Sequence, residues 1–220
     1  MATLARVSRL TEFSRSRLPP TMVLPAEFED LLDWMDAQGF ITENEEYGLH
    51  GQLTAEWWPP YGTAVVFHVE TPEEAGLEYW TGWDVPDGVL VPFARTGGDG
   101  SRAAFWLDPD GRQRIVHLGS GSGSTLCCEL VRTPLDLLRL LAIGYDEICW
   151  LDADSAAAPP EREDGTPAAN EPYREWLRAR GVSIPETAAE VVCGLEFMDD
   201  PPGSDDFRRW LDTNDPARSQ

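Results

Sequence analysis

Residues 89–150 decide the fold, and they read VLVPFARTGGDG (89–100), SRAAFWLDPDGRQRIVHL (101–118), GSGSGSTLCCELV (119–131) and RTPLDLLRLLAIGYDEICW (132–150). Short apolar runs with clear turns between them lead directly into a strongly amphipathic segment. Period-two alternation is typical of strands, whereas apolar residues at three- and four-residue spacing are typical of a helix. The order predicts a hairpin, a further strand and a helix that packs on the sheet.

The hairpin turn is predicted at 108–111, which reads Asp-Pro-Asp-Gly. Proline is pre-set for the second position of a turn, and glycine adopts positive φ at no steric cost. Phe105 and Leu107 share one face before this turn, and Val116 and Leu118 after it are expected to pack back against them. Two alternating runs around such a turn indicate an antiparallel pair.

The strand that follows has two different faces, since alternate residues of a strand point to opposite sides. Leu126, Cys128 and Leu130 share one face, and Thr125, Cys127 and Glu129 share the other.

The helix that follows has a clear start. Thr133 suits the N-cap, Pro134 suits the first helical position and Asp136 lies where a capping-box acid belongs. One apolar stripe then runs along the helix through Leu135, Leu138, Leu141, Ala142 and Tyr145.

Upstream, the sequence predicts a helix that opens at Leu24-Pro25 and ends at Gly39, with Phe28, Leu31, Leu32 and Met35 on its apolar side. Residues 63–69 are typical of a strand, and the alternation of Leu77, Tyr79, Thr81 and Trp83 predicts another. The Trp57-Trp58-Pro59-Pro60 corner between them fits either core packing or a recognition patch.

Downstream, residues 152–172 contain no large apolar residue and are expected to form a flexible loop. Short helical segments are then predicted around Trp176, after Ile184 and around Trp210. The expected fold class is α+β: a curved, mainly antiparallel sheet flanked by helices, in a single domain with appended C-terminal helices.

The two ends of the chain are expected to lie outside this domain, which would cover residues 22–215. Residues 1–21 hold four arginines and only one acid, Glu12, and we expect them to be a flexible arm. A transit peptide, a nucleic-acid hook and an extension before a later start at Met22 are the alternative interpretations. Residues 216–220 form a short tail.

The charge of the chain limits its partners. The 220 residues carry 39 acids against 17 bases, a formal net charge of −22, and every base is an arginine. Nucleic-acid binding needs clustered positive charge, so we expect no nucleic-acid partner and favour a basic protein. A merely solvated acidic surface is the alternative.

The cysteines indicate a reducing compartment. Cys127, Cys128, Cys149 and Cys193 form neither a CxxC pair nor a regular disulfide spacing, so buried free thiols in the cytoplasm are expected. No apolar run approaches the roughly 18 residues of a membrane span, and we therefore expect no membrane partner.

Motifs for bound groups are incomplete. The run Gly119–Thr125 lacks the lysine and the following helix of a phosphate loop. The Asp108 turn has Gly119 where a calcium loop needs a glutamate. His50, His68 and His117 stand apart from one another, without a zinc-ligand spacing. We therefore expect no metal site and no cofactor.

A catalytic set is equally hard to assemble from the sequence. Cys127, His117 and Glu129 are the one combination that suggests a nucleophile, a base and an acid. No nucleophile motif accompanies them, so the chain is expected not to be an enzyme.

The order of the short motifs resembles the SMI1/KNR4 family, the SUKH superfamily of bacterial immunity proteins. The matching segments are Leu24-Pro25 with Phe28 and Leu32, Val91-Pro92-Phe93-Ala94 with Gly97-Gly98-Asp99-Gly100, Phe105-Trp106-Leu107-Asp108, Pro134 with Leu137, Leu138 and Leu141, and Ile184-Pro185. The chain departs from the family pattern by having Gly39 alone after the first helix and by its long 152–172 loop. The resemblance implies an intracellular antidote that binds a cognate toxin, often a nuclease.

These observations predict a non-catalytic, cytoplasmic immunity protein that neutralises a basic, nuclease-type toxin. The alternatives are a regulatory or scaffold protein without a toxin partner and a small hydrolase. The predicted contact residues are Trp80, Trp83, Asp84, Asp87, Gly97, Gly98, Asp99 and Gly100. Tryptophan would serve as the anchor and the carboxylates as steering charges, unless the tryptophans are core residues and the acids merely solvated.

Overall fold

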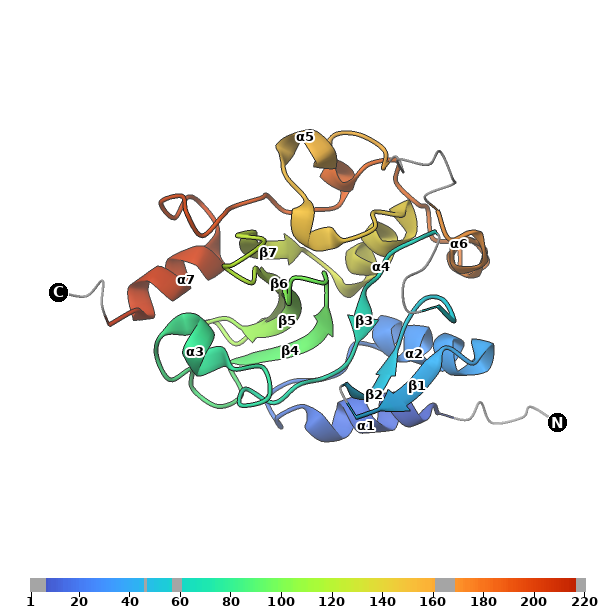
Figure 1. The fold of residues 1–220 in the computed structure, drawn as a ribbon, viewed down its shortest axis with the longest axis horizontal. Helices are drawn as coiled ribbons and strands as arrows, with labels where there is room; N and C mark the ends of the chain where they lie inside the picture. Colours follow the sequence, from blue (N-terminus) through green and yellow to red (C-terminus); the bar gives the residue numbers. More distant parts are fainter. Residues whose placement is uncertain (1–6, 46, 57–60, 161–168, 217–220) are drawn as a thin grey trace.

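Seven antiparallel strands form one open sheet in the computed structural model, which describes residues 7–45, 47–56, 61–160 and 169–216. Each strand pairs with its neighbours along the chain, in the order β1 to β7 (Figure 1). The strands are β1 Ile41–Asn44, β2 Gly48–Gly51, β3 Val66–Phe67, β4 Leu90–Arg95, β5 Arg102–Leu107, β6 Gln113–Leu118 and β7 Cys127–Val131. The expected α+β class and the single domain are confirmed.

The helices cover both faces of this sheet (Figure 1). They are α1 Arg9–Arg17, α2 Ala26–Gln38, α3 Leu77–Thr81, α4 Pro134–Ile143, α5 Ala153–Ala156, α6 Glu171–Arg178 and α7 Asp206–Asn214, with short 3-10 turns η1 Ile148–Trp150 and η2 Ala188–Glu190.

The alternation of β5 divides the interior into two cores. Phe105 belongs to the larger core, together with Phe28 of α2 and Leu138 of α4. Trp106, the next residue, belongs to a smaller core with Phe207 of α7. Its ring centroid lies 5.2 Å from that of Phe207.

The turn, the cap and the last strand of the central prediction are confirmed. Residues 108–111 form the β5–β6 turn, with Gly111 at φ 79°. The Thr133 side chain accepts a hydrogen bond from the Asp136 amide at 3.1 Å, and Pro134 is the first residue of α4. Cys127 and Cys128 contribute to different cores, as the strand alternation predicted.

Val116 and Leu118, however, lie in the smaller core, on the opposite face of the sheet from Phe105. Leu135, expected on the buried stripe of the helix, is only partly buried.

The prediction of a flexible arm at 1–21 is wrong for the described part of that segment. Residues 9–17 form α1, and Leu10, Thr11 and Ser14 are buried. The Ser8 amide and the Thr11 hydroxyl both donate to Asp33 Oδ1 of α2 at 2.9 Å. The sequence prediction failed because this helix presents small polar residues to the protein and satisfies their hydrogen bonds there. The domain therefore begins before residue 22.

Other boundaries also differ from the prediction. Residues 77–81 form a helix, α3, between two left-handed glycines, Gly76 and Gly82, and not a strand. Of the strand predicted at 63–69, only Val66 and Phe67 pair as β3. The segment after Ile184 contains only the single turn η2.

The predicted 152–172 loop is partly ordered. It begins with α5, in which Ala156 is buried, and it ends with Asn170, which caps α6. Residues 161–168, the Trp57–Pro60 corner and residues 217–220 of the predicted tail lie outside the described residues.

Candidate protein-binding surface

The predicted contact residues fall into two groups that lie apart. Gly97, Gly98, Asp99 and Gly100 form the turn after β4, whereas Asp84 and Asp87 precede the first residue of β4. The six residues of β4 separate the two groups, a span of roughly 20 Å at the usual rise per strand residue. One compact patch with all eight residues, as the sequence analysis predicted, is therefore not formed.

Trp80 of α3 belongs with the glycine turn. Its indole Nε1 donates to the Gly119 carbonyl at 2.6 Å. Gly119 follows β6, at the end of the sheet where the Gly97–Gly100 turn lies. Trp83, three residues later, packs edge-on against Trp210 of α7, with ring centroids 5.5 Å apart. The two predicted tryptophans therefore contact different elements: Trp80 contacts the loop after β6, and Trp83 contacts α7.

Asp99 joins the 97–100 turn to the 119–124 loop. Its carboxylate accepts the Ser101 amide at 2.9 Å and the Ser101 hydroxyl at 2.8 Å. It also accepts the Ser120 hydroxyl and the Ser124 amide, each at 2.8 Å. Burial acts to raise the pKa of Asp99, but the hydrogen bonds from Ser101, Ser124 and Ser120 outweigh it and hold the pKa below its usual range.

The same turn is fixed on its other side by Glu147. This carboxylate accepts the Gly98 amide at 2.5 Å on one oxygen and the Trp150 indole N–H at 2.6 Å on the other. Trp150 remains 54% exposed. An exposed aromatic side chain with a fixed orientation has the properties of a binding anchor, because little side-chain entropy is lost on association.

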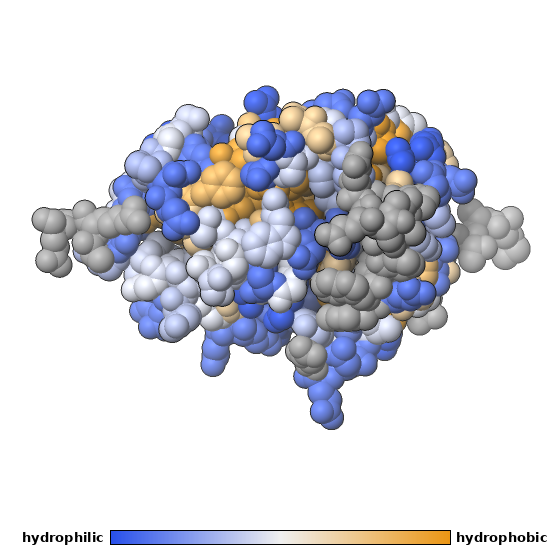
Figure 2. Space-filling model, turned by 45° about the horizontal axis from the view of Figure 1, so that its top comes forward, coloured by the Kyte–Doolittle hydropathy of each residue, from blue (hydrophilic) through white to orange (hydrophobic). Residues whose placement is uncertain are grey.

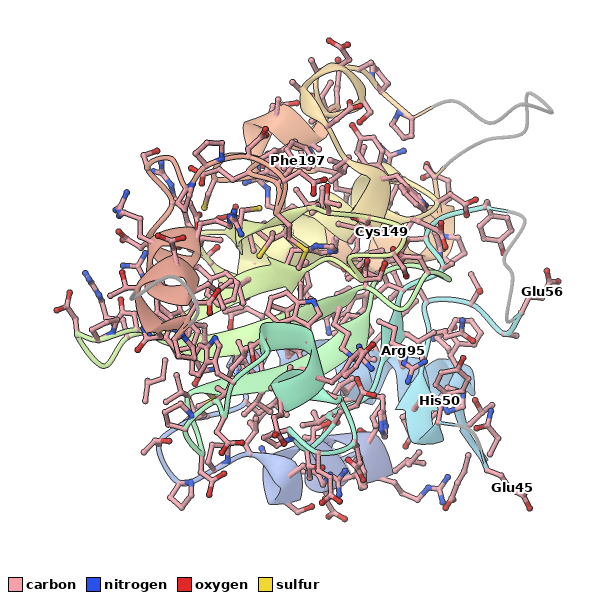
Figure 3. The ribbon with its side chains drawn as sticks, turned by 60° about the vertical axis from the view of Figure 1, so that its left-hand side comes forward. Glu45, His50, Glu56, Arg95, Cys149 and Phe197 are labelled. Carbon is pink, nitrogen blue, oxygen red and sulfur yellow. The ribbon has the colours of Figure 1, made fainter. Side chains whose placement is uncertain are left out.

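Glycine is required where these loops meet. A β-carbon on Gly97 would lie 2.2 Å from the Cys149 sulfur, and one on Gly123 would lie 2.8 Å from the Asp99 β-carbon. Figure 3 shows Cys149 in the interior of the molecule, in the region between Phe197 and Arg95. The glycine-rich runs therefore allow close packing of loops and do not form a phosphate-binding loop.

We name this surface the loop strip and define it by residues Tyr79, Trp80, 97–100, 119–124, Glu147 and Trp150. Hydrogen bonds connect it from Trp80 through Gly119, Ser120 and Asp99 to the 97–100 turn, and from there through Glu147 to Trp150. Tyr79 is 96% exposed at one end. Figure 2 shows one face of the molecule, on which hydrophilic residues predominate and apolar residues gather mainly in the upper part.

Sequence reasoning missed Glu147, Trp150 and the hydrogen-bonding role of the 119–124 loop. The signal for the first two was the pair Glu147 and Trp150 at a three-residue spacing, directly after the end of α4. No rule of spacing links that pair to a glycine turn about 50 residues earlier, so the contact depends on the tertiary fold.

The combination considered for catalysis is not assembled. Cys127 lies in the smaller core, whereas His117 pairs with Cys128, which belongs to the larger core. The two side chains therefore point to opposite faces of the sheet. Burial also raises the pKa of Cys127 to about 12 and lowers the pKa of His117 to about 4. A protonated buried thiol is a poor nucleophile.

Cys128, Cys149 and His117 are buried in the interior of the protein. All four cysteines are free. Burial raises the pKa of Cys128 and of Cys149. His117 is held between the Thr96 hydroxyl and the Leu126 carbonyl, each at 2.8 Å. Among the residues that the structure describes, no three His, Cys, Asp or Glu side chains gather as a metal site.

None of the described helices is both long and apolar enough to cross a bilayer. Compared with known proteins, the chain matches no family model, no curated protein and no solved structure. The resemblance to the SMI1/KNR4 family therefore stays a prediction from the residues, and the functional argument depends on the surface itself.

Proposed function

We propose that this chain acts by binding a basic protein, without catalysing a reaction, and that the loop strip is the surface of contact. The observation that carries the proposal is Trp150, a tryptophan that is more than half exposed while its N–H is already bonded to Glu147. Burial of such a side chain against a partner is favourable, because its indole N–H already has a hydrogen-bond acceptor and needs none from the partner.

Charge supports the choice of partner. The chain has a net charge of −22, and the strip contributes the carboxylates of Asp99 and Glu147. Arg102 donates to the Gly100 carbonyl, but its guanidinium is ion-paired with the buried Glu70 at 2.6 Å. A basic partner would therefore be steered towards the strip by long-range attraction.

The finer proposal is that the partner is a nuclease-type toxin and that the chain neutralises it in the cytoplasm. A nuclease presents a basic cleft, because it must hold a polyphosphate backbone. An acidic surface with a rigid aromatic anchor complements such a cleft and would occlude it.

The test begins with basic proteins encoded beside this chain. Each is purified and its association with the full chain is measured by surface plasmon resonance at low and at high salt. We expect rapid association at low salt that slows severalfold as salt rises. A toxin among these partners, with growth restored by this chain, would support neutralisation; binding without toxicity would point to a regulatory role instead.

Variants then assign the surface. Trp150→Ala should raise the dissociation rate at least about tenfold, as expected for a central aromatic anchor. Asp30→Asn on α2 removes one exposed acid from a different part of the surface and should leave that rate unchanged. Equal effects of the two substitutions would exclude the loop strip as the contact.

A further inference from the structure

A small cavity lies on the side of the sheet that holds the smaller core, between α3 and α7. Its volume is about 200 Å³, and its lining consists of Trp80, Thr81, Trp83, Met198, Arg208, Leu211, Asp212 and Asp215. Apart from Trp80, none of these residues belongs to the loop strip. The cavity is therefore a second site with its own chemistry.

Arg208 is the unusual member of this lining. It is only 6% exposed. Its Nη2 atom donates to the carbonyls of Met198 and Asp200, at 3.4 and 3.1 Å. Its buried Nε atom has no hydrogen-bond partner in the part of the chain that the structure describes. Within that same part, no carboxylate forms an ion pair with it.

The neighbouring thiol of Cys127 does not neutralise this charge. Cys127 lies beside Arg208, but burial raises the pKa of its thiol to about 12. The thiol is therefore protonated at neutral pH and supplies no negative charge. A buried guanidinium without a direct ion-pair partner is costly, and an anion bound to it in the cavity would remove much of that cost.

The other walls of the cavity suit an apolar body. Trp80 and Trp83 supply two indole rings, and Met198 and Leu211 supply apolar side chains. Trp83 is fixed by its edge-on contact with Trp210, whose ring in turn stacks on Phe207 at 5.9 Å. Aromatic walls of this kind favour a flat ligand.

Two carboxylates limit the charge of the ligand. Asp212 and Asp215 also line the cavity, and each takes part in an interaction of its own. Their negative charge disfavours a polyanion such as a phosphate. A single carboxylate on the buried Arg208 still gains a charge-assisted hydrogen bond in a poorly solvated site.

We propose that this cavity binds a small monocarboxylate with a flat apolar body. The carboxylate pairs with the Arg208 guanidinium, and the body packs against Trp80 and Trp83. The site is separate from the proposed protein-binding function, and its test needs no partner protein.

The probe is benzoate, with benzamide as the neutral molecule of the same shape. Each is titrated into the full chain, and the indole N–H signals of the tryptophans are followed by NMR. Benzoate should shift the signals of Trp80 and Trp83 in a saturable way, and its affinity should exceed that of benzamide at least about tenfold. Equal affinities, or shifts confined to other tryptophans, would overturn the proposal.

The matched variants are Arg208→Gln and Arg209→Gln. Arg209 follows Arg208 in α7, but it is half exposed and pairs with Asp206. Loss of benzoate binding is expected for the first variant and unchanged binding for the second.

A second variant keeps the proposal testable if Arg208→Gln fails to fold. The double change Asp212→Asn and Asp215→Asn retains Arg208 and removes the two rim charges. It should tighten benzoate binding about two- to fivefold and leave benzamide binding unchanged. Unchanged or weaker benzoate binding would contradict a site organised around the Arg208 charge.

Discussion

Leu10 and Gly51 are in direct contact: a β-carbon on Gly51 would lie only 2.8 Å from the Leu10 Cδ2 atom. Leu10 is fully buried in α1, and Gly51 ends β2. The N-terminal helix is thus packed so closely against the sheet that a side chain at position 51 would displace Leu10. The Met35 sulfur of α2 lies 2.9 Å from the same β-carbon position. The basic N-terminal segment is consequently an integral part of the core.

The first prediction concerns this helix. Leu10→Ala should lower the free energy of unfolding by about 2–5 kcal/mol, because a fully buried leucine is truncated and the surrounding side chains cannot close the cavity completely. Urea denaturation of the full chain measures the change. Arg9→Ala on the exposed side of α1 is the control and should change stability by less than about 0.5 kcal/mol. Similar values for both variants would mean that α1 does not pack as described.

The second prediction concerns the central helix. Leu138 of α4 is 2% exposed, whereas Leu135 on the same helix is only partly buried. Leu138→Ala should cost about 2–5 kcal/mol of unfolding free energy, and Leu135→Ala should cost clearly less. Both are measured by chemical denaturation. A larger loss of unfolding free energy for Leu135→Ala than for Leu138→Ala would mean that the opposite side of α4 faces the sheet.

The strands and the helix of residues 89–150 could be predicted from the sequence because local signals there agree with one another. The Asp108–Gly111 turn, the alternation of Phe105 and Leu107, and the Thr133 cap all favour the same arrangement that the tertiary structure adopts. Alternation failed at 77–81, where flanking left-handed glycines and packing of Leu77 into the smaller core select one helical turn instead.

The candidate surface was only partly predictable for a physical reason. Gly97–Gly100 and Trp80 were identified from turn chemistry and aromatic character. The contacts that join them depend on Asp99, whose four donors come from 101, 120 and 124, and on Glu147. Hydrogen bonds between loops distant in sequence leave no periodic pattern, so no local rule could have found them.

The third prediction concerns Gly97. Gly97→Ala would place a β-carbon against the Cys149 sulfur, and we expect a loss of about 1–3 kcal/mol from overpacking. Thermal denaturation provides the measurement. Gly194→Ala is the matched control, because no atom lies within 4 Å of its β-carbon position. If Gly97→Ala were tolerated as well as Gly194→Ala, the loops of the strip would not be rigidly packed.

The last prediction is the pH dependence that His117 causes. Its imidazole is buried, and burial lowers the pKa from 6.5 to about 4. The unfolded chain therefore binds a proton below pH 6.5 that the folded chain accepts only near pH 4, so the stability that neutral His117 confers is present above pH 6.5 and is lost as the pH falls. The loss is on the order of 3 kcal/mol across this window, at about 1.4 kcal/mol per pH unit.

The measurement is urea denaturation at several pH values between 4 and 7, for the wild-type chain and for His117→Gln. Other groups also titrate in this range, and the difference between the two chains removes most of their contribution. Glutamine retains a donor and an acceptor for the Thr96 hydroxyl and the Leu126 carbonyl, but it does not titrate. We expect the variant to be less stable at pH 7 and to lose less stability than the wild type as the pH falls. Parallel pH profiles would show that His117 is protonated equally in both states and is not held as a neutral ring between these two partners.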